Sequence, residues 1–341
     1  MKKYIFILAF ALAATSSFGQ KKKKNQEKVP VKKDEVQVTI NPQTSNGEEF
    51  HIVMPETAMI IIKTVTADGQ EKYANGLKEL ENLKLSQLKE LSVGSRVAGK
   101  VLEDRLLQKI ILEADQLEVL EISNFEIVAF PEIQKPNMKL RKLTLDKNNL
   151  KILPYSISNL TALENFSCSN PLQALPYSFA TLKNLQTVSL NYTDFATFPD
   201  AVFGLSNLSS LYISGSATST SKIKELPDLF EKLPELKELG VTNASLSALP
   251  KSVSLLKKLE KAFFSNNAFV DFPEVLAANP NLEYVSFTDN PLQWQPFLAS
   301  IKKIKWRGLF FLHETGFSKK QYEEIQKILP KIDVYYDGMN D

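Results

Sequence analysis

The sequence predicts an α/β solenoid, in which short parallel strands line the concave face of a curved array and a cap covers each end. Three observations predict this fold: a repeat of about 23 residues, apolar residues that alternate with period two inside each repeat, and a Leu-Pro or Phe-Pro pair at a fixed position of the repeat. Alternation with period two is typical of a strand with one buried face. A fixed period indicates that like units stack, because a single unit cannot bury its own apolar face.

The repeats are marked by leucines at equivalent positions. Successive leucines are 23, 23, 22, 23, 28, 23 and 23 residues apart: Leu117, Leu140, Leu163, Leu185, Leu208, Leu236, Leu259 and Leu282. Apolar residues stand three and five positions after each leucine, and Cys168 takes one of these positions. We therefore expect both positions to face the core and Cys168 to be a buried, inert thiol. In the 28-residue unit, the Ser/Thr-rich segment 215–222 predicts a surface loop inserted just after the strand.

Together these positions form the pattern L-x-x-L-x-L-x-x-N-x-L followed by x-x-L-P, which resembles the leucine-rich-repeat superfamily. The resemblance is to the short, Pro-punctuated repeats of bacterial and intracellular signalling members. It covers 117–296 strongly and extends more weakly to the segments that begin at Leu88 and Trp306. In the second of these segments, Leu309 and Phe311 are expected to face the core. The resemblance implies a solenoid with its strands on the concave face and a role in recognition rather than catalysis.

The sequence departs from the family pattern at the asparagine position. That position holds Asn148, Asn267 and Asn290, but other residue types stand there in five repeats. In the family, this asparagine supplies a buried ladder of hydrogen bonds between repeats. We therefore expect the ladder to be patchy.

The domain organisation follows from these patterns and from the composition at each end. It comprises a signal peptide at 1–19, a disordered basic linker at 20–35, an N-terminal β-rich cap at 36–87, an atypical first repeat with a helix at 88–116, leucine-rich repeats at 117–305, and a C-terminal repeat with its helix/strand cap at 306–341. The linker is expected to be disordered because 21–35 carries seven lysines against three acidic residues and has no apolar face to bury.

The signal peptide is predicted from its charge and its length. Lys2 and Lys3 precede the apolar run from Tyr4 to Ala14, which is too short to span a bilayer, and small residues precede a cut before Gln20. We therefore expect an exported protein that is periplasmic, cell-surface or secreted, with no transmembrane span in the mature chain.

The N-terminal cap is predicted from alternation and a turn signal. The segments from Val36 to Ile40 and from Met59 to Val65 are typical of strands, and Asp68-Gly69 favours a turn that closes a hairpin. After the weak first repeat, apolar residues recur at helical spacing and predict a helix on the convex side: Val101, Leu102, Leu106, Ile110 and Ala114. At the other end, an amphipathic helix is expected from Lys319 to Leu329 and a last strand from Ile332 to Tyr336.

The composition argues against catalysis and against nucleic-acid binding. The formal net charge is +2, and the predicted cut would remove two lysines, so the chain lacks the phosphate-neutralising charge that dominates binding to nucleic acid. Neither His51 nor His313 has a neighbour in metal-ligand spacing. We therefore expect a protein that is not an enzyme, with no catalytic residues, no metal and no cofactor. Cys168 is the only cysteine, so the disulfides of eukaryotic secreted repeat proteins are absent, which favours a bacterial protein.

The candidate binding residues are those expected to point out of the concave face. Aromatic and amide side chains gather there in the C-terminal half, and such surfaces suit macromolecular recognition. The predicted site consists of Tyr192, Tyr212, Phe263, Tyr284, Phe310, Asn191, Asn243 and Asn266. The expected partner of a monomeric scaffold is a protein or peptide. Three alternatives stay open: a glycan ligand, a structural envelope component with no discrete ligand, and aromatic rings that stack with each other only to stiffen the sheet.

Overall fold

The computed structural model describes residues 35–40, 50–55, 59–220, 222–277 and 279–337. The predicted signal peptide and the predicted linker, except Glu35, lie outside these residues. The chain divides into two compact units, Met1–Met59 and Ile60–Asp341. In the first unit, β1 (Glu35–Ile40) pairs antiparallel with β2 (Phe50–Pro55). The predicted single cap at 36–87 is therefore divided, because β1 and β2 belong to a different compact unit from the repeats.

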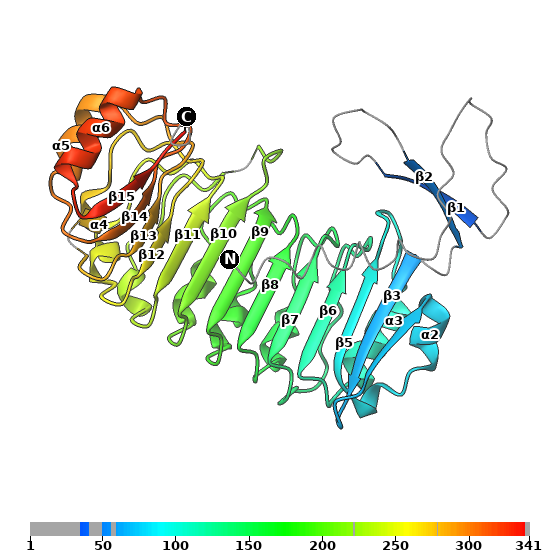
Figure 1. Ribbon diagram of the computed structural model, residues 1–341. Helices are drawn as coiled ribbons and strands as arrows, with labels where there is room; N and C mark the ends of the chain where they lie inside the picture. The colour runs from blue at the N-terminus through cyan, green and yellow to red at the C-terminus, as the bar shows by residue number, and fades with distance from the viewer. Residues whose placement is uncertain (1–34, 41–49, 56–58, 221, 278, 338–341) are drawn as a thin grey trace, which may run out of the picture. The chain divides into compact units, whose positions relative to one another are not determined.

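The second unit is built on one 13-stranded sheet with the strand order β15-β14-β13-β12-β11-β10-β9-β8-β7-β6-β5-β3-β4 (Figure 1). The strands are β3 (Ile60–Thr66), β4 (Glu71–Asn75), β5 (Leu88–Ser95), β6 (Val119–Ser123), β7 (Lys142–Asp146), β8 (Asn165–Ser169), β9 (Thr187–Thr193), β10 (Ser210–Gly215), β11 (Glu238–Thr242), β12 (Lys261–Phe263), β13 (Tyr284–Ser286), β14 (Gly308–Phe311) and β15 (Ile332–Tyr335). From β5 to β15, every neighbouring pair is parallel. The predicted parallel sheet is confirmed.

The predicted core positions pair with each other from strand to strand. Leu120 is opposite Leu143, and Ile122 is opposite Leu145, so each repeat stacks one full unit onto the next. These four side chains are at most 1% exposed. Because side chains alternate across a strand, the residues between them face the other way, toward the concave side.

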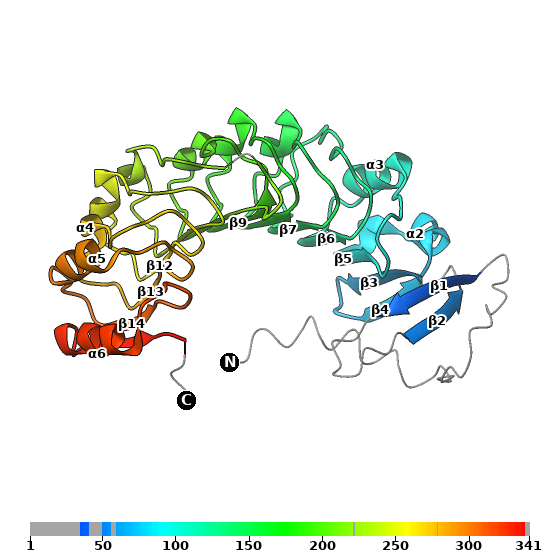
Figure 2. The same ribbon diagram turned by 90° about the horizontal axis from the view of Figure 1, so that it is seen from above.

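Helical turns return the chain along the convex side of this unit, while the strands line its concave side (Figure 2). The helices are α2 (Leu77–Asn82), α3 (Asp104–Glu113), α4 (Glu274–Ala277), α5 (Trp294–Ile301) and α6 (Lys319–Ile328). The 3₁₀ helices are η2 (Leu85–Gln87), η3 (Tyr155–Asn159), η4 (Tyr177–Thr181), η5 (Asp200–Gly204), η6 (Phe230–Lys232) and η7 (Lys251–Leu255).

The Leu-Pro pair explains where most of these turns begin. Proline fixes φ near the helical value and has no N–H to leave unpaired in a first turn. Pro154 directly precedes η3, and its carbonyl accepts a hydrogen bond of 3.1 Å from the Ile157 N–H. Pro176 directly precedes η4 in the same way, with a bond of 2.9 Å from the Phe179 N–H. The fixed proline therefore sets the point at which η3, η4, η5 and η7 start.

The predicted elements at the two ends of the array are present. In the N-terminal cap, β3 and β4 form a hairpin around the Asp68-Gly69 turn, and β3 pairs antiparallel with β5. The predicted convex helix is α3, but Val101 and Leu102 both precede it. Leu102 is buried, whereas Val101 is 59% exposed and was wrongly included among the apolar residues of the helix. At the C-terminal end, Ser318 and Gln321 form a capping box that starts α6, and β15 is the last strand of the sheet.

Candidate functional site

The concave face of the second unit changes character along the array. The central outward residue of each strand is Glu121 in β6, Thr144 in β7, Ser167 in β8 and Ser189 in β9. In β10 to β15 the equivalent residues, which pair from strand to strand, are Tyr212, Gly240, Phe263, Ser286, Phe311 and Tyr335. The N-terminal half of the face is thus polar, and the C-terminal half alternates rings with small residues.

The rings of the C-terminal half form a continuous row, which we name the aromatic ladder: Tyr212, Phe263, Tyr284, Phe311 and Tyr335. Successive ring centroids are 5.8, 5.1, 4.5 and 4.8 Å apart. The last two contacts are stacked, with interplanar angles of 22° and 11°. Each of these side chains is half-buried. The ladder runs over six consecutive strands, from β10 to β15.

Two small residues make the ladder continuous. Gly240 lies between Tyr212 and Phe263, and a Cβ atom added there would come within 2.8 Å of the Tyr212 ring. The Tyr212 ring therefore lies across β11 and reaches Phe263 on the following strand. Ser286 has the same place on β13, where Tyr284 fills the gap between Phe263 and Phe311. Any larger side chain at Gly240 would have to displace the Tyr212 ring.

The prediction for Phe310 was wrong. Phe310 is fully buried, and Phe311 takes the concave position instead. Val285 of β13 pairs with Phe310, so the last repeat begins one residue later than Trp306 indicated. A shift of one residue moves every side chain of a strand to the opposite face. Because both Phe310 and Phe311 are apolar, alternation alone could not choose between them.

Tyr335 and Gly240 were also missed by sequence reasoning. Tyr335 was assigned to the last strand of the cap rather than to the concave face, although it pairs with Phe311. A glycine carries no side chain to attract attention. Aligning the six strands in the correct register and reading the residue at the central outward position of each would have found both Gly240 and Tyr335.

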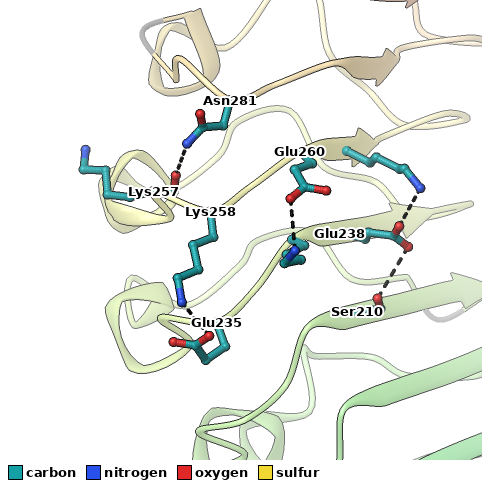
Figure 3. Close-up of polar contacts among 9 residues, drawn as sticks. Ser210, Glu235, Glu238, Lys257, Lys258, Glu260 and Asn281 are labelled. Atoms are coloured by element: carbon teal, nitrogen blue, oxygen red, sulfur yellow. Dashed lines mark hydrogen bonds and ion pairs between the residues drawn. The ribbon is translucent and has the colours of Figure 1, made fainter.

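A charged network lies beside the start of the ladder. Glu238 of β11 accepts hydrogen bonds from Lys261 at 2.6 Å and from Ser210 at 3.4 Å (Figure 3). It also accepts a hydrogen bond from the Tyr212 hydroxyl. Burial alone would raise the pKa of Glu238, but the bonds from Lys261 and Tyr212 outweigh burial and hold its pKa below the ordinary value. The hydrogen bond between Lys261 and Glu238 also raises the pKa of Lys261. The network fixes the orientation of the first ring in the ladder.

Further ion pairs join successive repeats at the strand starts. Lys258 contacts Glu235 at 2.6 Å, and Lys237 contacts Glu260 at 3.2 Å (Figure 3). All four side chains are between about two-fifths and one-half exposed. Exposed pairs of this kind contribute little to stability, about 0–1 kcal/mol each. They are more important as a pattern that aligns neighbouring repeats.

The predicted amides have partners within the protein. Asn191 donates to the Ser189 hydroxyl at 3.0 Å, and Asn243 donates to the Ser214 hydroxyl at 3.0 Å. Asn266 donates to the side-chain oxygen of Asn243. Asn243 and Asn266 also adopt left-handed backbone conformations, with φ of 50° and 54°. Asparagine tolerates this conformation better than most residues, so the backbone gives an independent reason for both amides.

Tyr192 lies apart from the other predicted aromatic residues. It is 60% exposed and has a φ of 57°, a conformation that is costly for a bulky side chain. It lines a cavity of about 360 Å³ at the strand ends of the N-terminal half, together with Asn124 and Lys147, which share its positive φ. Asn149 also lines this cavity with a positive φ, so four non-glycine residues in this conformation mark a locally strained edge, separate from the ladder.

The described residues hold no group of three or more His, Cys, Asp and Glu side chains that could bind a metal ion. His313 pairs with Asp337 through its Nδ1 atom at 2.9 Å, and the side chain of His51 lies outside the described part. Burial raises the pKa of the Cys168 thiol to about 12, as expected for an inert core side chain. Among the described helices, none has the length and apolar character needed to cross a bilayer.

Buried asparagines connect the repeats after the strands. Asn148 donates to the Ile122 carbonyl at 2.8 Å and accepts from the Phe125 N–H at 3.1 Å. Asn290 makes the equivalent bonds to the Phe264 carbonyl at 2.9 Å and from the Phe269 N–H at 3.1 Å. Each of these buried asparagines thus connects its own repeat to the preceding one. The strands that they follow recur once per unit of about 23 residues.

The repeats form a solenoid of the leucine-rich-repeat fold.

The asparagine ladder of these leucine-rich repeats is less patchy than the sequence predicted. Asn170 stands one residue before the expected position, yet it is 1% exposed and bridges the same way. It donates to the Leu145 carbonyl at 2.5 Å, and its side-chain oxygen accepts from the Asn148 N–H at 2.6 Å. The unit that contains Asn170, from Leu163 to Leu185, is one residue shorter than most, and the asparagine stands one place earlier in it.

Curated proteins match about half of the chain. No protein-family model matches the chain. The chain is 30% identical over 204 residues to a candidate disease resistance protein of Arabidopsis thaliana, a match that covers 52% of this chain and 16% of the relative. It is 30% identical over 193 residues to an adenylate cyclase of Schizosaccharomyces pombe, which covers 55% of this chain and 10% of the relative. The chain therefore spans less than a fifth of either relative.

Several solved structures are similar to part of the chain. A leucine-rich-repeat protein of Leptospira interrogans is 21% identical, with 69% of this chain and 81% of that chain covered and a TM-score of 0.39. Internalin C2 of Listeria monocytogenes is 21% identical, with 65% and 82% covered and a TM-score of 0.39. The leucine-rich-repeat domain of the type III effector XopL is 17% identical, with 55% and 60% covered and a TM-score of 0.41.

Proposed function

We propose that the chain is a non-catalytic recognition scaffold that binds a protein or peptide on the concave face, over the aromatic ladder. The observation that carries the proposal is a continuous row of half-buried rings on a face whose central positions in β6 to β9 are polar. Half-buried rings lose their remaining apolar surface to a ligand at little entropic cost, because stacking already holds them in place.

The stacking geometry favours a peptide over a glycan. Sugar rings bind to the open face of an aromatic ring, but Tyr284 and Tyr335 both stack against Phe311, with ring centroids 4.5 and 4.8 Å away. The exposed part of Phe311 is therefore mainly its edge. Ring edges pack well against aliphatic side chains and against the faces of incoming aromatic side chains. A peptide supplies both of these groups.

We further propose that the protein is bacterial and exported, and that it acts in the periplasm, at the cell surface or in the medium. The charged and apolar pattern of 1–19 supports export, although these residues lie outside the described part. The single cysteine supports a bacterial origin, because it leaves no disulfide at either end of the array.

The binding proposal is tested with a display library of random 12-residue peptides and a panel of oligosaccharides. Wild-type protein is expected to enrich peptides, and Phe263→Ala and Tyr284→Ala are expected to lose them. The matched controls Thr144→Ala and Ser189→Ala change the polar half of the same face and should keep binding. Circular dichroism verifies that each variant is folded. Enrichment that survives both ring removals, or saturable binding of oligosaccharides alone, would contradict the proposal.

A further inference from the structure

The end of the aromatic ladder is bordered by carboxylates. Asp289, Glu314 and Asp337 follow the ends of the consecutive parallel strands β13, β14 and β15, and each side chain is exposed. We name these three residues the acidic rim. Neighbouring strands are about 4.8 Å apart, so three like charges lie close together on one edge of the sheet.

Hydrogen bonds and ring contacts connect the acidic rim to the ladder. The His313 ring lies 6.3 Å from the Phe311 ring of the ladder, and its Nδ1 atom contacts Asp337 at 2.9 Å. The Glu314 N–H donates to the other Asp337 oxygen at 2.6 Å, and the Asp289 N–H donates to the His313 carbonyl at 3.0 Å. The rim and the end of the ladder therefore form one continuous surface.

Basic side chains are missing from this part of the chain. No Lys or Arg occurs at 262–301, 308–318 or 332–341. Within the described residues, neither Asp289 nor Glu314 forms an ion pair. The cations near these strands stand at the opposite edge, where Arg307 precedes β14 and Lys331 precedes β15. The charge of the concave face is thus divided across its width, and the strand ends carry an unbalanced negative charge.

We propose that the segment bound by the ladder is a cationic peptide, whose apolar side chains pack on the ring edges and whose Lys or Arg side chains reach the acidic rim. This inference rests on the proposed function and names the chemistry of its ligand. A cation near the rim relieves the repulsion among the three carboxylates, and opposite charge also speeds association. The contact is with the carboxylates rather than with Phe311, because Tyr284 and Tyr335 stack against this ring and cover the faces that a cation would need.

The test uses fluorescein-labelled 12-residue peptides that alternate Leu and Tyr with Arg, with Ser or with Glu, and it measures binding by fluorescence anisotropy. The Arg peptide is expected to bind most tightly, and its affinity should fall as salt shortens the electrostatic range from about 10 Å to about 3 Å. Asp289→Asn and Glu314→Gln are each expected to weaken the Arg peptide about fivefold, the effect of losing one exposed ion pair. Asparagine suits the positive φ of 55° at Asp289, so that variant should fold normally.

Two controls separate the inference from the proposed function. Glu324→Gln on α6 removes one exposed charge outside the sheet and should leave affinity unchanged. Phe311→Ala should weaken all peptides that bind the ladder, whatever their charge. If Ser or Glu peptides bind as tightly as the Arg peptide and still require Phe311, the cationic inference is wrong and the recognition function stands. If the Arg peptide binds without needing Phe311, or if no peptide binds, both fail.

Discussion

The N-terminal and C-terminal halves of the concave face share one backbone design but present different surfaces. In β7 and in β11, the core positions are the fully buried Leu143 and Leu239. The concave residues that follow them are Thr144 in β7 and Gly240 in β11, where the glycine makes room for an aromatic ladder. The core residues are restricted by stacking in every repeat, whereas the concave residues are not. A difference confined to the concave residues therefore reports what that surface contacts.

The largest expected effect tests the register of β14, on which the extent of the ladder depends. Phe310→Ala removes a fully buried ring and should lower the free energy of unfolding by about 3–5 kcal/mol. Phe311→Ala removes a half-buried ring with two stacking contacts and should cost about 1–2 kcal/mol. Urea denaturation followed by circular dichroism measures both values. A larger decrease in the free energy of unfolding for Phe311→Ala than for Phe310→Ala would support the register expected from the sequence, in which Phe311 is buried.

The next effect tests whether the two halves share the same scaffold. Asn148→Ala and Asn290→Ala each remove a buried bridge and leave a backbone N–H unpaired, that of Phe125 or of Phe269. Each should lower the free energy of unfolding by about 1–3 kcal/mol, the cost of an unsatisfied buried group. Matching losses in thermal or urea denaturation would show that the halves differ only at their surface. A decrease in stability for only one of the two variants would show that the halves do not share the same scaffold.

Glycines at concave positions offer a smaller and more selective contrast. A Cβ at Gly240 meets the Tyr212 ring at 2.8 Å, and one at Gly94, near the other end of the sheet, meets only the Ser123 hydroxyl oxygen at 2.9 Å. Gly240→Ala should cost about 1 kcal/mol because the ring must move. Gly94→Ala should be neutral or slightly stabilising, since alanine restricts the unfolded chain and the serine can rotate. Near-ultraviolet circular dichroism should change for Gly240→Ala only, and equal spectra would argue against the reach of Tyr212 across β11.

The smallest effect concerns pH at the boundary between the halves. The pKa of Glu238 lies below its ordinary value of 4.5, so its charged form is favoured in the folded state. Its stabilising contribution is therefore complete above the unfolded pKa and is lost as pH falls through the folded pKa. Compared with Glu238→Gln, wild type should be more stable by up to about 1 kcal/mol near pH 6 and should lose this advantage near pH 3. A constant difference across that range would mean that the Lys261 and Tyr212 bonds do not depend on charge.

The repeat itself could be predicted from the sequence alone. The spacing of the leucines located the strands from β6 to β13, because only one register places both apolar positions of each strand in the core. The hairpin at Asp68-Gly69 and the C-terminal helix were equally clear, since turn residues and helical spacing are local signals. Tyr212, Phe263 and Tyr284 were placed on the concave face for the same reason.

The tertiary structure decided where local signals were balanced or silent. In β14, four apolar residues in a row allow either register, and pairing with β13 selects the one that buries Phe310. The ladder also depends on a residue without a side chain, Gly240, and on Tyr335 in the last strand of the cap. The rings of the ladder that contact each other are 21 or more positions apart in the sequence, and a pattern of period two does not report such contacts. The sequence therefore determined the structure of each repeat, and only the stacking of the repeats determined which rings are in contact.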